Sequence, residues 1–517
     1  MMGSGAGDGA HSRAPAGSAG GVTPVTGLMS IRGIEVRGES AIRIGDVELG
    51  LARTHEGDRV VMLAPDQRPT LEGFEAEAST FQGRRLLVGP TNCRNLSALR
   101  RLLPWLTPRP LGLHPSFGFG DRLGSATPGH VRALRAAYIP LAPIFAQQSI
   151  REMERTGRGP GEVLNDATWG VFAAGWRDGF GADADHLKTI ADVDACLAAG
   201  YTFFTFDPGA YVDGAADSQP PQSVRAALDG LPWKELDDNS RQMFNRYLRM
   251  VLDLGDRSLR FSEDGIARAA VKYGRAVAHV AVLYRHLKAR GPGAEVEVSV
   301  DETETPTTPA QHAYIACELR RLGVDWVSLA PRFVGRFEKG VDYLGDPAAF
   351  EADAALHAAL ARRLGPYKLS LHSGSDKLSV YGALARQAGN LLHVKTAGTS
   401  YLEALRAVAT LDPGLFRAMY ALARDRYEED RASYHVSASL ERAPSPDSLR
   451  DTELVSLLDA FDPRQVLHVT FGSVLARHGE RLRALLRANS KVYEANLERH
   501  FIRHLTPFET LGPRTAP

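Results

Sequence analysis

Two histidines and one glutamate have the chemistry of metal ligands and stand at or directly after short apolar segments. These residues are His186, Glu302 and His372. Imidazole and carboxylate groups bind catalytic divalent ions, which keep a coordination position open for substrate. We predict a metal site at these three residues, with His435 as a further ligand, zinc as the expected ion and manganese, nickel or cobalt as alternatives. A histidine at a strand end can equally be a hydrogen-bonding or substrate-contact residue.

Acid/base and substrate-binding groups occupy similar positions along the chain. Asp185, Glu302 and Lys395 are the predicted acid/base residues, because proton transfer needs carboxylates or amines beside the reacting atoms. Basic residues at strand ends indicate an anionic small molecule, since arginine pairs with carboxylates through two hydrogen bonds and lysine acts as a point charge. Ordinary surface charge is the alternative interpretation. The predicted substrate-binding residues are Arg122, Gln147, Gln148, Lys188, Asp207, Arg332, Ser373, Asp376, Lys377 and Thr396.

The middle of the chain alternates strand-like apolar runs with amphipathic helical runs. Gly200, Gly323 and Gly365 each follow a helical run and precede a strand-like run, as helix-ending glycines do. Eight parallel strands with helices between them form a (β/α)8 barrel, whose chemistry lies at the carboxyl ends of the strands. We predict this α/β fold, with a doubly wound open sheet as the alternative. The predicted strands are 111–113, 139–145, 184–188, 201–206, 296–300, 326–330, 368–371 and 391–394.

The predicted barrel occupies residues 108–405 and carries additions on both sides. Residues 1–25 are rich in Gly, Ala and Ser, which predicts a disordered tail. Short β-rich runs split by turn residues predict a small β-containing N-terminal subdomain over 26–107. The fourth and fifth strands are too far apart for one helix, so we expect a helical insertion at about 222–290. Residues 406–517 are expected to form a C-terminal helical extension that ends in a long helix over 477–505.

Composition excludes several classes of protein. The 517 residues include 61 Lys and Arg against 61 Asp and Glu, whereas proteins that bind nucleic acids or anionic membranes are normally basic. The sequence has no apolar run of about 18 residues, so no membrane-spanning helix is expected. The 3 cysteines form no CxxC pair and cannot build a disulfide framework, which predicts a cytoplasmic location. No nucleic-acid or membrane partner is expected, and both a monomer and a homo-oligomer remain open.

Common nucleotide and hydrolase motifs are missing. Gly118-x-Gly120-x-x-x-Gly124 misses the GxGxxG dinucleotide fingerprint by one residue, and no acidic residue follows at the expected distance. A glycine-rich turn, whose backbone N–H groups can face an anion, explains this run better. The chain has no P-loop, HExxH or GxSxG sequence and therefore no support for an NTPase, a zincin or an α/β-hydrolase.

Long strings around the candidate residues, such as GFGDRLG at 118–124 and SLHSGSDK at 370–377, carry a resemblance. The other strings span 146–152, 183–189, 300–308, 328–333, 339–343 and 394–401. They resemble the tagaturonate epimerase family, which interconverts tagaturonate and fructuronate. The resemblance runs from about residue 110 to 508 and does not include the first 25 residues. It implies an epimerase of keto-uronates, with neutral ketohexoses such as fructose and tagatose as further substrates.

The chemistry implied by this resemblance is demanding. Tagaturonate and fructuronate differ at C4, counted from the end nearer the C2 ketone, or at C3 counted from the carboxylate. The C4 hydrogen is β to the ketone, so simple enolisation does not acidify it. Retro-aldol cleavage of C3–C4 and re-addition needs a Lewis acid and an acid/base group, whereas transient oxidation needs a nicotinamide. The histidine and carboxylate groups favour the first route. A metal-dependent aldolase or isomerase of sugar acids, or a silent sugar-acid-binding protein, is the alternative function.

Overall fold

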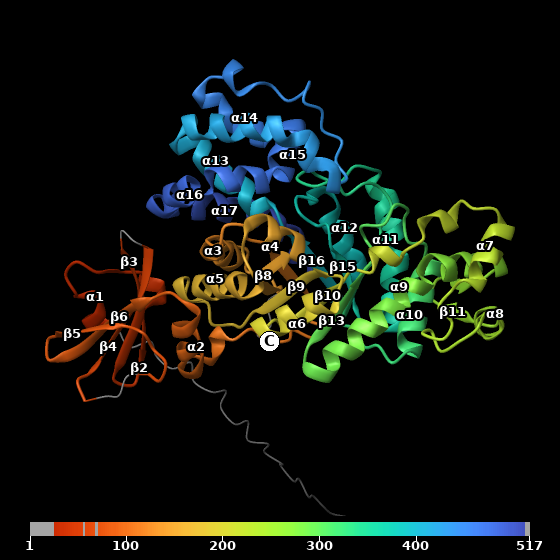
Figure 1. Ribbon diagram of the computed structural model, residues 1–517, viewed down its shortest axis with the longest axis horizontal. Coiled ribbons are helices and arrows are strands. Elements are labelled where there is room, and N and C mark those ends of the chain that lie inside the picture. The colour runs from red at the N-terminus through yellow and green to blue at the C-terminus, as the bar shows by residue number, and fades with distance from the viewer. Residues whose placement is uncertain (1–24, 55–56, 68–70, 512–517) are drawn as a thin grey trace, which may run out of the picture. The chain divides into compact units, whose positions relative to one another are not determined.

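The N-terminal unit of the chain is a small antiparallel sheet. The computed structural model describes residues 25–54, 57–67 and 71–511, so the predicted tail over 1–25 lies outside the described residues apart from Val25. The chain divides into two compact units, Met1–Pro90 and Thr91–Pro517 (Figure 1). The first has the strand order β1-β3-β4-β6-β5, with β2 paired to β3. Its strands are β1 (Glu35–Val36), β2 (Ile42–Ile44), β3 (Val47–Thr54), β4 (Gly57–Pro65), β5 (Glu77–Phe81) and β6 (Arg84–Pro90).

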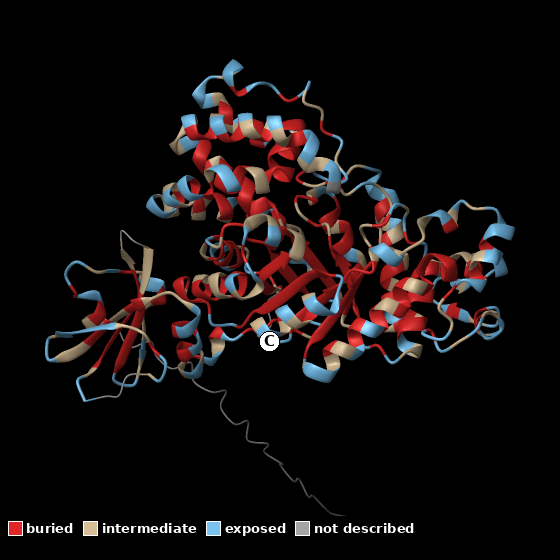
Figure 2. Ribbon diagram, in the orientation of Figure 1, coloured by how far each residue is buried: buried red, intermediate tan, exposed pale blue. Residues whose placement is uncertain are grey.

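The second unit is built on a closed barrel of eight parallel strands, which confirms the predicted (β/α)8 class (Figure 1). The strands follow chain order around the barrel, and the last pairs with the first to close it. Nearly all their residues are buried, as expected for parallel strands with helices outside and packed side chains inside (Figure 2). They are β7 (Ser116–Phe119), β8 (Ala142–Ser149), β9 (Gly181–Leu187), β10 (Phe203–Phe206), β13 (Glu295–Ser299), β14 (Ser328–Ala330), β15 (Lys368–Leu371) and β16 (Leu392–Thr396).

The first barrel strand is β7, so the prediction of a strand at 111–113 was wrong. Leu111 and Gly112 instead form a turn in which both backbone N–H groups donate to the carboxylate of Glu295. Gly112 has a φ of +59°, a left-handed conformation that does not continue a strand. Leu111 is buried. The apolar character of this run therefore reflects packing before the first strand. The other seven predicted strands overlap observed ones.

Helices separate the barrel strands and cover their outer face. In α6 (Ile190–Ala199), Thr189 and Asp192 form a reciprocal capping box at the start, and Gly200 ends the helix with a φ of +96°. Helix α2 (Cys93–Leu102) precedes the barrel. The helices that follow the strands are α3 (Thr127–Ala137), α4 (Ile150–Thr156), α5 (Pro160–Ala173), α6 (Ile190–Ala199), α10 (Pro309–Arg321), α11 (Pro347–Leu364), α12 (Leu378–Ala388) and α13 (Thr399–Leu411).

A largely helical insertion separates β10 from β13. It contains α7 (Pro221–Asp229), α8 (Ser240–Tyr247), the hairpin of β11 (Val251–Asp253) and β12 (Ser258–Arg260), and the long α9 (Glu263–Arg290). Buried Lys272 on α9 donates to the side chains of Asp217 and Thr305. Thr305 belongs to the loop after β13. The insertion therefore holds the loop that carries Glu302.

The chain after the barrel is mainly helical and contains α14 (Pro413–Asp430), α15 (Phe461–Val469), α16 (Phe471–Ala488) and α17 (Ser490–Leu505), with short 3-10 turns and loops between α14 and α15. The predicted helix over 477–505 is thus two helices, because Asn489 leaves the helical conformation at φ −125° and ψ 35°. Helix α17 packs along α3, where Phe501 contacts Phe119 and His130. Within the described residues, no helix has the length and apolarity needed to cross a membrane.

Buried His130 on α3 makes stability depend on pH. Its ring lies against Phe119 and Phe501, and its Nε2 is 2.9 Å from Ser400 Oγ. Burial lowers the pKa of His130 to about 4. The unfolded chain takes up a proton near pH 6.5 that native His130 does not. Its contribution to stability is therefore complete above about pH 6.5 and is lost as the pH falls towards 4.

We expect His130→Gln to lose less stability on acidification than the parent protein. Between about pH 7.5 and 5.5, the loss in unfolding free energy should be smaller by about 1 kcal/mol, because glutamine takes up no proton in either state. Urea unfolding of both proteins at the two pH values measures this difference. Equal losses in the two proteins would show that His130 titrates normally in the native state.

Candidate active site

His186 and His372 meet at the carboxyl end of the barrel. His186 lies at the end of β9 and His372 directly after β15, and their Nε2 atoms are 2.9 Å apart. Both side chains are buried. Two nitrogens bound at about 2.0–2.1 Å to one ion stand roughly 3 Å apart. The observed spacing therefore fits two ligands that converge on a common ion.

The other nitrogen of each imidazole contacts a carboxylate. His186 Nδ1 is 3.1 Å from Asp207 Oδ2, and His372 Nδ1 is 3.2 Å from Glu297 Oε1. A carboxylate accepts hydrogen bonds, so each Nδ1 carries a hydrogen. Burial alone would lower the pKa of His372, but Asp301 and Asp185 outweigh it and hold the pKa well above its usual range. At 2.9 Å the two Nε2 atoms share either a proton or a metal ion, since two bare lone pairs would repel each other. Carboxylates that orient histidine ligands in this way are the usual outer shell of a metal site.

Two carboxylates can complete the donor set. Asp185 Oδ1 is 3.2 Å from His372 Nε2, and Glu302 Oε1 is 3.7 Å from His186 Nε2. The ligand atoms of Asp185, His186 and His372 lie within 4.8 Å of one another, as do those of His186, Asp207 and Glu302. Burial alone would raise the pKa of Asp185, but Lys395 and His372 outweigh it and hold the pKa well below its usual range. The residues present therefore fit a divalent ion.

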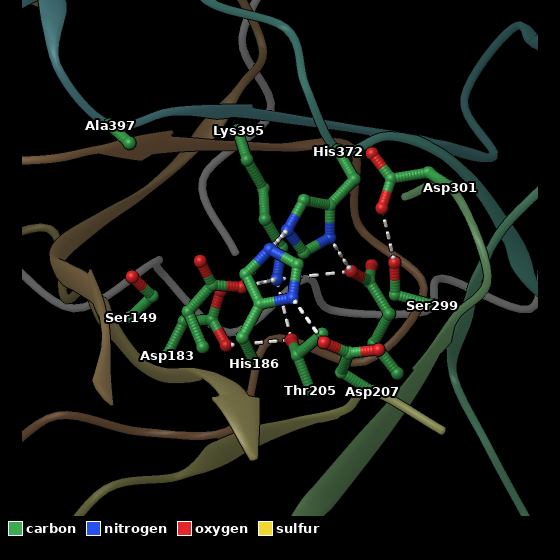
Figure 3. A network of polar contacts seen from close by, with 12 residues as sticks. Ser149, Asp183, His186, Thr205, Asp207, Ser299, Asp301, His372, Lys395 and Ala397 are labelled. Carbon is green, nitrogen blue, oxygen red and sulfur yellow. Dashed lines mark hydrogen bonds and ion pairs between the residues drawn. The ribbon is translucent and has the colours of Figure 1, made fainter. Parts of the chain in front are cut away.

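A cluster of buried charges lies next to the imidazole pair (Figure 3). Lys395 Nζ is 2.7 Å from Asp183 Oδ2 and 3.0 Å from both Asp185 Oδ1 and Glu297 Oε1. It also donates to Thr205 Oγ1. Burial raises the pKa of Asp183 to about 6. Burial alone would also raise the pKa values of Asp185 and Glu297, but Lys395 outweighs it and holds them well below their usual ranges, so all three carboxylates are mainly ionised at neutral pH. One ammonium group does not balance three carboxylates, and the surplus negative charge favours positive charge at the imidazoles, supplied by protons or by a metal ion.

An irregularity in β9 brings two consecutive side chains into the site. His186 has a φ of +54°, a left-handed conformation that costs a non-glycine residue about 1 kcal/mol or more. Against β10, Phe204 pairs with Ala184 while Phe206 pairs with Leu187, so β9 contains an extra residue. Successive residues of a regular strand point to opposite faces. The bulge therefore allows Asp185 and His186 to contact His372 together.

A narrow cavity opens beside the imidazole pair. Its volume is about 40 Å³, room for a few water molecules, so the side chains around it must shift when a six-carbon ligand binds. All but one of its lining residues have polar side chains, which can form hydrogen bonds with a small polyhydroxylated molecule. Besides His186 and His372, the lining residues are Arg122, Gln147, Ser149, Arg151, Glu152, Asp185, Lys339, Ser373, Ser375, Lys377, Ala397, Tyr434 and His468.

Two of the predicted basic residues already use their N–H donors within the protein. Lys377 lines the cavity but donates its three protons to the carbonyl oxygens of Glu338, Val341 and Ser375. Burial lowers the pKa of Lys377 to about 7. Lys395 is enclosed by the carboxylate cluster and does not line the cavity. An acid/base role for Lys395 and a substrate contact for Lys377 stay predictions.

The remaining predicted basic residues divide between the cavity and its surroundings. Arg122 lines the cavity, with its guanidinium 2.6 Å from Glu152 and stacked 3.7 Å over the ring of Phe471. Arg332 donates to a neighbouring backbone carbonyl and Lys188 pairs with the carboxylate that orients His186. Neither of these two is part of the cavity wall.

The predicted polar residues divide in the same way. Gln147 and Ser373 line the cavity, where Gln147 donates to Asp185 and Ser373 donates to Asp301. Gln148 accepts a hydrogen bond from Arg158, and Thr396 donates to the Gly118 carbonyl. Asp207 orients His186 as described above. Gln148, Thr396 and Asp207 are not part of the cavity wall.

The structure does not bring His435 to the imidazole pair. His435 is exposed and belongs to none of the clustered ligand groups found among the described residues. Its neighbour Tyr434 lines the cavity instead. A ligand role for His435 stays a prediction that the geometry does not support.

A second group with metal-ligand chemistry surrounds Asp376. Its ligand atoms, with those of His500 and His504, lie within 4.8 Å of one another. His504 Nε2 accepts the backbone N–H of Asp376, and Arg464 lies 2.9 Å from Asp376 Oδ1. Internal donors therefore already occupy one oxygen of this carboxylate, Oδ1, and one imidazole lone pair. We interpret the group as a structural ion-pair cluster that anchors α17 to the barrel.

The strand-end criterion missed two cations and two carboxylates. Lys339 and Arg151 line the cavity, but Lys339 lies in the loop well after β14 and Arg151 lies on α4. The strings at 146–152 and 339–343 include both residues, but a strand-end position does not single them out. Asp183 and Glu297 lie inside β9 and β13, and both are fully buried. Carboxylates that alternate with apolar residues within a buried barrel strand were the signal that could have identified them.

The fold and site together define a (β/α)8 barrel with a histidine–carboxylate donor set beside a polar small-molecule cavity. The sequence model of the tagaturonate epimerase family matches residues 39–508. The chain therefore belongs to this family, as the sequence strings predict.

Individual relatives agree with this assignment. The chain is 42% identical over 487 residues to the tagaturonate/fructuronate epimerase of Thermotoga maritima, and the alignment covers 92% of this chain and 98% of that protein. The native crystal structure of the fructuronate-tagaturonate epimerase of Cohnella laeviribosi is 34% identical, with a TM-score of 0.86 over 92% of this chain and 97% of that chain. A glycerol complex of the same protein gives the same identity and TM-score, over 92% of this chain and 96% of that chain.

Proposed function

We propose that this protein is an epimerase that interconverts D-tagaturonate and D-fructuronate with the aid of a divalent metal ion. The observation that carries the metal dependence is the 2.9 Å approach of His186 Nε2 to His372 Nε2, with a carboxylate on each Nδ1. Family membership and the 42% identity to a tagaturonate/fructuronate epimerase support the substrate. Fructose and tagatose are proposed as secondary substrates. The unpaired cysteines are in keeping with a cytoplasmic enzyme.

His186, His372 and Asp185 would hold the ion, with Glu302 as the alternative carboxylate ligand. A divalent ion there acts as a Lewis acid that stabilises negative charge on the ketone oxygen. Zinc is the first candidate, because imidazole and carboxylate are its usual ligands, and manganese, nickel and cobalt are the alternatives.

Glu302 is the proposed base for the C4 hydroxyl. Burial alone would raise the pKa of Glu302, but Lys339, His186 and Arg151 hold it well below its usual range. Glu302 is thus a carboxylate at neutral pH, and it is only partly buried. Asp185 is the alternative acid/base residue, since Gln147 of the cavity wall donates to its second oxygen.

Retro-aldol chemistry accounts for inversion at a carbon whose hydrogen is not acidic. When the C4 hydroxyl loses its proton, the electrons of the C3–C4 bond move into the ketone to give the enediolate of dihydroxyacetone. C4 becomes the aldehyde of the second fragment, which keeps the carboxylate. Rotation of this aldehyde about C4–C5 presents its other face. Re-formation of C3–C4 and return of the proton to the C4 oxygen complete the epimerisation.

We expect product formed in deuterated water to carry no deuterium at C4, because retro-aldol epimerisation never breaks the C4–H bond. Tagaturonate incubated with the metal-loaded protein and followed by NMR tests both the reaction and its route. The expected product is fructuronate with a full C4 proton signal. Deuterium at C4 would point to deprotonation at carbon, and accumulation of three-carbon products would favour the aldolase alternative.

A further inference from the structure

The lysines around the cavity differ in how many hydrogen-bond donors they have left. An ammonium group has three N–H bonds. Lys377 gives all three to backbone carbonyls, and Lys395 is surrounded by three carboxylates and Thr205. Lys339 Nζ has two acceptors among the described residues, Glu302 Oε1 at 3.1 Å and Ser373 Oγ at 3.3 Å. One N–H bond of Lys339 therefore remains for a ligand in the cavity that this side chain lines.

The loop that carries Lys339 is fixed by buried groups behind it. Lys377 donates hydrogen bonds to backbone carbonyls on both sides of Lys339, those of Glu338 and Val341. Arg464 Nε donates to the Gly340 carbonyl at 2.6 Å, and Gln465 Nε2 donates to the carbonyl of Lys339 itself at 3.2 Å. Both donors lie on α15 of the C-terminal extension. A charge held in place before binding loses little conformational freedom when its ligand arrives.

The charge around Lys339 favours an anionic ligand. Glu302 lies 3.1 Å from Lys339 and 3.5 Å from Arg151, so one carboxylate is shared by two cations. This trio keeps a net positive charge on the cavity wall. The same cavity presents the imidazole pair. A molecule with a ketone at one end and a carboxylate at the other matches these two features.

We propose that Lys339 binds the carboxylate of the sugar acid, which sets the preference for uronates over ketohexoses and retains the cleaved fragment. The proposal rests on the proposed function and names the residue that recognises its substrate class. Inversion at C4 requires rotation about C4–C5, and this rotation leaves the carboxylate carbon, C6, in place. An ammonium group at C6 therefore anchors the aldehyde fragment while its other face turns towards the enediolate.

Lys339→Met tests the proposal, because methionine keeps an unbranched side chain of similar length and removes the charge. A charged hydrogen bond of this kind corresponds to about a ten- to hundredfold effect. We expect kcat/KM for tagaturonate to fall by that factor, while kcat/KM for tagatose changes by less than about threefold. Released dihydroxyacetone should rise relative to epimerised product. Lys339→Arg, which keeps the charge, should recover part of the uronate preference.

Arg336→Met is the matched control on the same loop. Its side chain is exposed and does not line the cavity, so the variant should keep the parent preference and release no extra dihydroxyacetone. Metal content is measured for every variant. Equal losses of kcat/KM on tagaturonate and tagatose, or loss of metal from Lys339→Met, would overturn the proposal. Lys339 would then act by positioning Glu302 and not by binding the carboxylate of the substrate.

A binding measurement separates this proposal from the proposed function. Gluconate carries the carboxylate without a ketone, and glucitol carries neither. Calorimetry should show gluconate binding that weakens about ten- to hundredfold in Lys339→Met, with glucitol binding unchanged. A metal-loaded parent that fails to convert tagaturonate yet shows this pattern would refute the proposed reaction alone. Unchanged gluconate binding would refute the role of Lys339 alone.

Discussion

His372→Ala is expected to abolish epimerisation and to remove the bound metal while the fold stays intact. His372 Nε2 lies 2.9 Å from His186 Nε2, and alanine leaves one imidazole where two must converge. With one ligand lost, we expect turnover to fall by about a thousandfold or more. Metal content per chain, turnover of tagaturonate and circular dichroism on the same sample measure the three effects together.

His114→Ala is the matched control for this variant. His114 is exposed and precedes β7, at the opposite end of the barrel, so metal and turnover should match the parent. Glu302→Gln, as a comparison, keeps the shape of the side chain and removes its charge. It should lose turnover yet keep the metal if Glu302 is the base, and lose both if it is a ligand. An alanine at position 372 that keeps both metal and turnover would refute the proposed site.

Lys395→Met is expected to destabilise the protein strongly, whatever its effect on catalysis. Its ammonium group lies within 3.0 Å of the carboxylates of Asp183, Asp185 and Glu297, and its side chain is 1% exposed. Removal of one partner from a buried ion cluster typically costs about 3–5 kcal/mol, because the remaining charges lose their compensation. The midpoint of urea unfolding of the metal-free protein should therefore shift to clearly lower denaturant.

Neutralising one carboxylate should recover part of this loss. Asp183→Asn leaves Asp185 beside His372 and removes one buried charge, so the double variant with Lys395→Met should be more stable than Lys395→Met alone. The two substitutions share a contact, so their effects should not add. A Lys395→Met protein as stable as the parent would show that the carboxylates are protonated or otherwise compensated in the native state.

The barrel could be predicted from sequence because apolar residues are spaced differently along its strands and along its helices. Buried parallel strands read as short apolar runs, and glycines such as Gly200 and Gly323 mark where helices end. The run at 111–113 looked like a strand but is a turn, since two adjacent N–H groups there bind Glu295. Local apolarity does not distinguish a barrel strand from residues packed before it.

The imidazole pair could also be predicted, because the ends of parallel strands converge at one face of a barrel. His186 lies at the end of one strand and His372 directly after another that is distant in sequence, and the closed barrel brings the two residues together. Lys339 and Arg151 could not be found in this way, because loop conformation and the hydrogen bonds from α15 decide where they lie. The same limit applies to Lys377, because its position in the sequence does not reveal that its ammonium group donates to three backbone carbonyls.

The most direct test of a metal-dependent epimerase is the rate of tagaturonate–fructuronate interconversion when metal is returned to metal-free protein. We expect no measurable turnover after chelation and a recovery that saturates at one ion per chain, first with zinc and otherwise with manganese, nickel or cobalt. Full turnover by protein shown to be free of metal would contradict a Lewis-acid role for an ion at His186 and His372.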